Sequence, residues 1–150
     1  MPPMHIDEDS PVTTVGDADS ELAERLGQEL TSFNTSTTGI GDQRGLSVQV
    51  RDSEALLAGL TGWTWGTCAG IEHVWVRDDQ RRNGLGGRLL KVAEAEARKR
   101  GCTQILVSSF TFQAPDFYKR HGYVEFARTE GIPTAAGADV HMVKVLPALN

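Results

Sequence analysis

Cysteine is scarce in this sequence of 150 residues, and its two thiols, Cys68 and Cys102, lack the C-x-x-C spacing of redox and metal motifs. A chain of this length buries enough surface to fold without a disulfide or a bound metal, so we expect neither. No apolar run approaches the about 18 residues of a membrane span, and the first residues lack the basic and apolar segments of a secretory signal. We therefore expect a cytoplasmic protein with no membrane partner and two unpaired thiols.

Positive charge is in the minority, because the formal net charge is −5 and the pI is near 5.3. This balance disfavours nucleic acid as a partner. The distribution is uneven: residues 1–30 carry eight carboxylates and one arginine, Arg25, whereas residues 77–100 carry eight Arg or Lys against four acids. A solvated helix face accounts for much of the second cluster. The pair Arg81 and Arg82 is different, since it directly precedes a glycine-rich stretch.

Apolar periodicity predicts a flexible acidic tail over residues 1–10 and one domain over residues 11–150. In the expected strand over residues 55–64, the glycines at 59 and 62 indicate a bulge or a close backbone approach. The expected elements are strands over 11–15, 46–51, 55–64, 71–76, 103–109, 123–127 and 140–146, and helices over 20–33, 84–100 and 114–121, with loops over 34–45 and 129–137. This order indicates an α/β (α+β) fold with a mixed, mostly antiparallel sheet of six to seven strands and helices on both faces.

The segment from Val76 to Arg88 carries the clearest chemical signal. A strand ends there, a polar turn follows, and glycines open a long helix. Unpaired N–H groups at a helix N-terminus, together with the helix dipole, favour an anion, and glycine lets that anion approach the backbone. The sequence lacks the P-loop pattern, and it also lacks the dinucleotide fingerprint of G-x-G-x-x-G followed by an acidic residue. A phosphate cradle of a different kind is indicated.

The spacing Arg81-x-x-Gly84-x-Gly86 resembles the GNAT superfamily of N-acetyltransferases, in which this segment binds the pyrophosphate of acetyl-CoA. Residues 71–76 are similar to the family's fourth strand, and residues 117–123 are similar to its "FYxxxGF" element. Strand order and spacing agree with the family over residues 46–146. The resemblance implies the GNAT fold, acetyl-CoA as co-substrate with no metal, and Tyr118 as the general acid that protonates the departing thiolate.

The resemblance also implies a set of cofactor contacts. Backbone amides of residues 82–87 and the side chains of Arg81 and Arg82 would hold the pyrophosphate, and residues 74–76 would bind pantetheine. An Asn that the family often places seven residues before the tyrosine is replaced by Thr111, so Thr111 or Gln113 would supply that contact. The implied cofactor-binding residues are Val74, Trp75, Val76, Arg81, Arg82, Asn83, Gly84, Leu85, Gly86, Gly87, Arg88, Thr111 and Gln113.

An alkylamine is about 0.04% neutral at pH 7, a handicap of about 4.6 kcal/mol for a nucleophile. Glu72, a lone carboxylate in an apolar strand, is the candidate that removes the proton or binds the cationic amine. Strand alternation turns His73 to the opposite face unless a bulge intervenes. His141 on the last strand and Asn34 after the first helix are further candidates for binding the acceptor.

The three tryptophans, Trp63, Trp65 and Trp75, are interpreted as core or as the wall of an acceptor pocket. No residue suggests a covalent nucleophile, so direct transfer in a ternary complex is expected. The acceptor indicated by an acidic chain is a small cationic amine, such as an amine antibiotic, a polyamine or an amino acid. A protein N-terminus or lysine is the alternative acceptor, and a non-catalytic acetyl-CoA sensor is the alternative function. The oligomeric state, a homodimer included, stays open.

Overall fold

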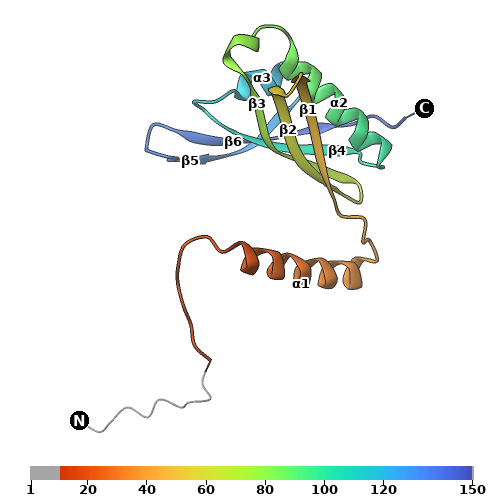
Figure 1. Cartoon of the computed structure of the whole chain (residues 1–150), viewed down its shortest axis with the longest axis vertical. Coiled ribbons are helices and arrows are strands. Elements are labelled where there is room, and N and C mark those ends of the chain that lie inside the picture. The colour runs from red at the N-terminus through yellow and green to blue at the C-terminus, as the bar shows by residue number, and fades with distance from the viewer. Residues whose placement is uncertain (1–10, 150) are drawn as a thin grey trace.

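A computed structural model describes residues 11–149, and the tail expected over residues 1–10 lies outside the described residues. Three helices and six strands follow one another, with a short 3-10 turn (Figure 1). In chain order the elements are α1 (Ser20–Thr38), β1 (Arg44–Asp52), β2 (Ala55–Trp65), β3 (Cys68–Val76), η1 (Asp78–Gln80), α2 (Leu85–Lys99), β4 (Gln104–Phe110), α3 (Pro115–Arg120), β5 (Val124–Glu130) and β6 (Ala138–Val145).

The six strands form one sheet in the order β1-β2-β3-β4-β6-β5. Every neighbouring pair is antiparallel except β3 and β4, which confirms the expected mixed, mostly antiparallel sheet. A strand over residues 11–15 was also expected, and that prediction is wrong because these residues form no strand. They precede α1, which stands apart from the sheet, so their β-branched side chains have no neighbouring strand with which to pair.

The two parallel strands separate soon after they meet. β3 and β4 pair at only three positions, Cys68 with Gln104, Ala69 with Ile105, and Gly70 with Leu106. β3 then continues to Val76 and β4 to Phe110 without further pairing between them. The sheet therefore opens into a wedge whose walls are the carboxyl-terminal halves of β3 and β4.

Helix α2 covers one face of the sheet and carries the core. Four of its apolar side chains, three of them four residues apart, are fully buried on the side that meets β1, β2 and β3. These residues are Leu89, Leu90, Ala93 and Ala97. The helix lies between two left-handed glycines, because Gly84 is its N-cap at φ +76° and Gly101 follows its C-cap, Arg100, at φ +93°.

Helix α1 is capped at its N-terminus by Asp19, whose side chain accepts from the Leu22 N–H at 3.0 Å. It ends at Thr38 rather than near residue 33, and Gly39 in the left-handed conformation terminates it. The polar run Asn34–Thr38 carries no apolar periodicity, which is why it resembled a loop. Figure 1 shows α1 on the far side of the sheet from α2 and detached from it, and α1 has no buried residue. Across residues 11–149, no helix combines the length and apolar character that crossing a bilayer requires.

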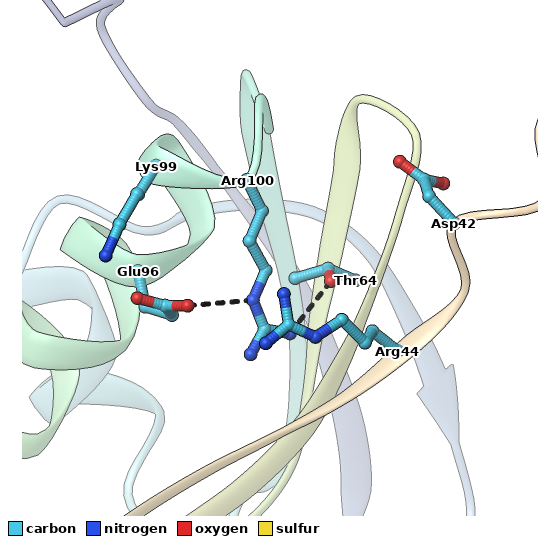
Figure 2. Close-up of a pocket in the computed structure, with 6 residues that line it drawn as sticks. All are labelled: Asp42, Arg44, Thr64, Glu96, Lys99 and Arg100. Carbon is cyan, nitrogen blue, oxygen red and sulfur yellow. Dashed lines mark hydrogen bonds and ion pairs between the residues drawn. The ribbon is translucent and has the colours of Figure 1, made fainter.

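Arg100 ties the end of α2 to the start of the sheet (Figure 2). Its guanidinium pairs with Glu96 at 3.0 Å and donates to the Gly45 carbonyl at 2.9 Å and the Thr64 hydroxyl at 3.1 Å. The polar hollow around it, about 300 Å³, is therefore occupied by contacts that hold α2 against β1 and β2. Elsewhere, Cys68 and Cys102 are free thiols, as expected, and burial raises the pKa of each.

Candidate functional site

The wedge between β3 and β4 is a cleft of about 1290 Å³, and α2 and α3 complete its walls. Most of the residues singled out from the sequence line it, although they come from four separate segments. Those that line the cleft are Glu72, Val74, Trp75, Val76, Arg81, Arg82, Gly84, Leu85, Gly86, Gly87, Arg88, Gln113 and Tyr118. The remaining four, Asn34, Asn83, Thr111 and His141, do not line it.

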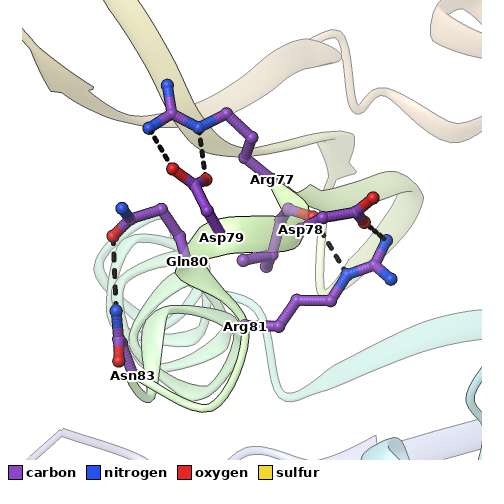
Figure 3. A network of polar contacts seen from close by, with 7 residues as sticks. Arg77, Asp78, Asp79, Gln80, Arg81 and Asn83 are labelled. Atoms are coloured by element: carbon purple, nitrogen blue, oxygen red, sulfur yellow. Dashed lines mark hydrogen bonds and ion pairs between the residues drawn. The ribbon is translucent and has the colours of Figure 1, made fainter.

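The turn between β3 and α2 is held by its own charged side chains (Figure 3). Arg77 grips Asp79 with a two-pronged pair, one contact being 2.8 Å, and this hydrogen bonding lowers the pKa of the Asp79 carboxyl. Arg81 pairs with Asp78 at 2.9 Å and donates to the Val76 carbonyl at 3.3 Å. The Arg81 side chain, expected on the pyrophosphate, thus closes the turn.

The backbone after this turn forms a concave row of donors. Arg82 and Gly84 both have left-handed backbones, at φ +73° and +76°. The first i to i−4 hydrogen bond of α2 joins the Arg88 N–H to the Gly84 carbonyl at 3.1 Å, and no side chain caps the helix. The N–H groups of residues 85–87 therefore have no partner within the helix and carry the positive end of its dipole. Such a nest of amides is suited to an anion.

Two glycines of this row let α2 meet α3. A Cβ on Gly86 would lie 3.0 Å from the Phe117 ring, and one on Gly87 would lie 2.8 Å from the His121 ring. Phe117 and His121 also stack edge to face, with ring centroids 4.8 Å apart. The absence of side chains at Gly86 and Gly87 therefore brings the amide row beside α3. His121 lines the cleft as well, a position that the sequence interpretation missed.

Tyr118 sits on α3 at the inner end of this contact and is only 7% exposed. Its ring packs edge to face on Phe117 and on Tyr123, with centroids 5.2 and 5.6 Å apart. Among residues 11–149 its hydroxyl makes no hydrogen bond, and none of their buried side-chain polar atoms lacks a partner, so the hydroxyl must reach the cleft. Burial raises the pKa of the Tyr118 phenol, so it stays protonated at neutral pH.

Behind Tyr118 lie two buried polar residues, Tyr123 and Glu94, and the half-buried Lys144. Tyr123 donates to Glu94 at 3.4 Å, and Lys144 forms a salt bridge with the other oxygen of the same carboxylate. Burial and the neighbouring Glu94 carboxylate both raise the pKa of Tyr123, whose phenol remains a donor. The ring of Tyr118 thus packs against a side chain fixed at both ends, which restricts where its hydroxyl can point.

A bulge resolves the orientation of the two polar residues of β3. Gly62 pairs with Ile71 and Thr61 with His73, so Glu72 is an extra residue on β3. A Cβ on Gly62 would lie 2.1 Å from the Gly70 carbonyl oxygen, so glycine is required there, as its position in the strand suggested. Both Glu72 and His73 line the cleft, and the His73 Nδ1 is 2.9 Å from the Thr61 hydroxyl.

His141 lies one residue behind the cleft wall. Its Nδ1 is 2.8 Å from the hydroxyl of Ser108, which lines the cleft, and its Nε2 is 2.8 Å from the hydroxyl of Thr129. His141 therefore reaches the cleft through Ser108 rather than directly. Ser108 was placed in the wall strand by the sequence but not singled out, because a strand serine gives no signal until its partner on the next strand is known.

The two candidates for the missing asparagine contact have different positions. Thr111 closes the end of the β4–β6 pair, where its hydroxyl accepts from the Ala138 N–H at 3.2 Å. Gln113 lines the cleft, and its side-chain oxygen accepts from the Phe110 N–H at 3.0 Å. Two other residues lie elsewhere: Asn34 is on the detached helix α1, and Asn83 donates to Gln80 at 3.4 Å within the turn (Figure 3).

The charge at the cleft is mainly positive on the α2 and α3 side. Lys91 and Arg120 join Arg82 and Arg88 among the lining residues, although neither was singled out from the sequence. Lys91 follows Arg88 by three residues, a spacing that places both on one helix face and could have revealed it. Of the tryptophans, only Trp75 lines the cleft. Within residues 11–149 no group of three or more metal-ligating side chains occurs.

Comparisons with known proteins point to one family. The family model described as "Acetyltransferase (GNAT) family" matches residues 10–123. Acetyltransferase Atu2258 of Agrobacterium fabrum is 31% identical over 109 residues, which cover 72% of this chain and 80% of that protein. A crystal structure of an acetyltransferase from Bacillus cereus has a TM-score of 0.74 at 30% identity, covering 89% of this chain and 98% of that one.

A third relative has a more specific name. The blasticidin-S acetyltransferase of Streptomyces morookaense is 43% identical over 72 residues. The match covers 45% of this chain and 51% of that enzyme, so it spans about half of the relative's length. The amide row at α2, the wedge between β3 and β4, and these matches together lead to one assignment. The chain belongs to the GNAT family of acetyltransferases and is an acetyl-transferring enzyme.

Proposed function

We propose that this enzyme transfers an acetyl group from acetyl-CoA directly to the primary amine of a small cationic molecule. The observation that carries the proposal is the meeting of three features in one cleft. The amide row at the start of α2 suits a pyrophosphate, the unpaired edge of β3 suits pantetheine, and the buried phenol of Tyr118 faces the space between them. An anion site, an extended channel and an acid in that order match the parts of a coenzyme A thioester.

The β3 edge supports the second step of this assignment. Pairing with β4 stops at Gly70, so the groups of residues 74–76 that point toward the cleft have no strand to bond. An extended chain with amide groups can take the place of that strand, as a peptide does when it adds to a sheet edge. Pantetheine carries two amides, and residues 107–109 of β4 form the opposite wall.

Tyr118 would then act at the sulfur. The amine nitrogen attacks the acetyl carbonyl, the C–N bond forms, and the C–S bond breaks. The thiolate that leaves takes the phenolic proton of Tyr118, and the amine's proton passes to a base. Because burial raises its pKa, the Tyr118 phenol is a protonated donor at neutral pH. The departing thiolate accepts a proton far more readily than the thioester sulfur does, so the proton moves as the C–S bond breaks.

The structure offers two routes for the amine's proton. Glu72 projects from the bulge into the cleft and forms no salt bridge or side-chain hydrogen bond within residues 11–149, so its carboxylate is available. His141 is the second route through Ser108, but both its ring nitrogens already have partners at 2.8 Å. We favour Glu72 as the base, with Ser108 as a neighbour that orients the acceptor.

The acceptor is proposed as a small cation for two reasons. Glu72 lines the cleft two residues beyond Gly70, the last residue of β3 that pairs with β4, and a carboxylate there attracts a protonated amine before it is neutralised. A relative that matches nearly half of this chain is named for blasticidin S, which favours an amine antibiotic over a polyamine, an amino acid or a protein terminus. A sensor that only binds acetyl-CoA would need neither Tyr118 at the cleft nor Glu72.

The decisive experiment incubates the enzyme with acetyl-CoA and a panel of amines, including an amine antibiotic, a polyamine, amino acids and a peptide N-terminus, and follows free CoA. Turnover with a small cation is expected. Binding of acetyl-CoA without turnover of any amine would favour the sensor, and turnover of the peptide alone would move the acceptor to proteins.

The base is tested by the pH profile of kcat/KM. In Glu72→Gln the acidic limb should flatten, and activity should partly recover at high pH, because up to about 4.6 kcal/mol of deprotonation then comes from solvent. Ser108→Ala serves as the comparison and should keep the limb. If instead Ser108→Ala flattens the limb and Glu72→Gln only raises KM, the base is His141 acting through Ser108.

A further inference from the structure

Helix α1 exposes an apolar stripe, none of whose members is buried against the part of the chain that the structure describes. Its members recur at four-, four- and three-residue spacing, so they share one face. They are Leu22, Leu26, Leu30 and Phe33, between 52% and 66% exposed. A helix gains most of its stability from burying such a face, and soluble chains rarely leave a contiguous apolar surface of this kind uncovered.

The sheet has an uncovered face as well. α2 and α3 lie on one face, where Val74, Val76 and Met142 join the core. The residues that alternate with these point the other way, toward the side where Figure 1 shows α1 standing off. They include Trp75, Val124 and Val145, which are 47%, 65% and 75% exposed. The face opposite α2 thus exposes apolar side chains between β3 and β5, beside the polar side chains of Ser108 and His141.

The connection between α1 and β1 keeps these two surfaces apart. Only residues 39–43 join them, and the segment is anchored along its length. The Ile40 carbonyl accepts from the Trp65 indole at 3.0 Å, and the Asp42 carboxylate accepts from the Gly66 N–H at 2.8 Å. Gln43 is bonded back to α1, because its side-chain oxygen accepts from the Thr31 hydroxyl at 2.8 Å.

The base of this connection is also fixed. Arg100 donates to the carbonyl of Gly45, two residues after the connection, at 2.9 Å, and Figure 2 shows the bond from Arg100 to Thr64 of β2 at the same place. Folding α1 onto its own sheet would require breaking these contacts, because the short segment has no slack residue to absorb the rotation. The stripe therefore projects as a preformed arm, held at a distance from the open sheet face of its own chain.

We propose that the arm packs on the open sheet face of a second copy, which returns its own α1 in a symmetric exchange. Stripe and face occur on the same chain, so a two-fold axis satisfies both at once. Their sizes agree: 19 residues give a helix about 28 Å long and about 10 Å wide, and the four strands from β3 to β5 span about 14 Å, so one helix laid along the strands covers most of the open face. Two helix faces and two sheet faces of about 280 Å² each give roughly 1,100 Å², close to a stable interface.

The exchange also completes the site, a consequence that depends on the proposed function. Trp75 belongs both to the open sheet face and to the cleft lining, and His73 lies beside it on the cleft wall. The partner's α1 would therefore cover the acceptor side of the wedge, opposite the amide row.

The test uses molar mass in solution, measured by sedimentation with the full chain. The wild type is expected to be a dimer at micromolar concentration. Leu26→Glu with Leu30→Glu places two charges in the stripe and should give a monomer with red-shifted tryptophan emission. Gln28→Glu with Ser32→Glu adds the same charge on the polar side of α1 and should remain a dimer. A monomeric wild type, or a stripe variant that stays dimeric, overturns the proposal.

A mixing experiment identifies which surfaces meet. Val124→Glu with Val145→Glu alters the sheet face but keeps the stripe intact, and it should be a monomer by itself. Mixed with the stripe variant, it should form dimers containing one copy of each, because one intact stripe then meets one intact face. Dimers of the sheet variant alone would mean that stripe meets stripe, and would overturn the exchange.

The monomeric variants must be shown to be folded, and acetyl-CoA binding provides the check because the amide row lies on the opposite side of the sheet. Retained binding with lost dimerisation supports the exchange. A dimer by mass in a protein that binds no acetyl-CoA would refute the proposed function and leave the exchange standing, so the two failures are distinguishable.

Discussion

Gly84→Ala tests the amide row with little steric side effect. Gly84 has φ +76°, and a Cβ built there meets nothing within 4 Å. The folded protein therefore loses only the backbone preference, about 1–2 kcal/mol for an L side chain in the left-handed region. The added methyl group also stands where an anion would approach the first turn of α2. Losing one charge-assisted hydrogen bond costs about 1.5–3 kcal/mol, or roughly a 10- to 150-fold rise in the Kd of acetyl-CoA.

The same helix offers a matched control. Gly101 has φ +93°, and a Cβ there also meets nothing within 4 Å, but it lies at the opposite end of α2 from the amide row. Gly101→Ala should therefore lose a similar free energy of unfolding while binding acetyl-CoA like the wild type. Denaturant titration measures the first quantity and calorimetry the second. Equal Kd values in the two variants would show that the amide row does not hold the cofactor.

Three further expectations follow from the geometry of the site. Tyr118→Phe should lower kcat by about 10²- to 10⁴-fold with nearly unchanged acetyl-CoA affinity, and full turnover would remove the phenol from the mechanism. Gly62→Ala should lose both stability and activity, because its Cβ would lie 2.1 Å from the Gly70 oxygen; a wild-type melting temperature would show that the bulge relaxes freely. Burial raises the folded-state pKa of Tyr118 and Tyr123, so their contribution to stability is complete below about pH 10 and is lost as pH rises further. Alkaline denaturation should therefore be shallower in Tyr123→Phe.

Sequence patterns predicted the helices and strands of the site better than the ends of these elements and the contacts between them. The period of Leu89, Ala93 and Ala97 gave α2 to within one residue at each end, because a buried stripe leaves a strong signal. The strand at 11–15 was wrong because β-branched composition says nothing of whether a neighbouring strand exists. The end of α1 was misplaced because threonines are poor indicators of either helix or loop.

Contacts made across the fold were beyond the sequence. Glu72 and Tyr118 could be singled out one at a time, but the bulge that turns both Glu72 and His73 to the cleft depends on the register of β2 with β3. The link from Ser108 to His141 likewise requires that β4 pair with β6, which no local pattern indicates. Arg81 is a further case, because its charge suggested a ligand contact, whereas its pairing with Asp78 within the turn could not be foreseen from the sequence.

Because only three residue pairs join β3 to β4, the sheet consists of two halves that are weakly connected to each other. β1, β2 and β3 form one half, β4, β6 and β5 form the other, and the ladder between them ends at Gly70. A molecule bound along the wedge spans both halves where the protein has no bond of its own. Bound acetyl-CoA would then connect the two halves of the sheet as well as react. After its release, only the three paired positions of β3 and β4 would hold the halves together in the sheet. Slowed amide exchange on both halves at once, upon binding, would be the signature of that coupling.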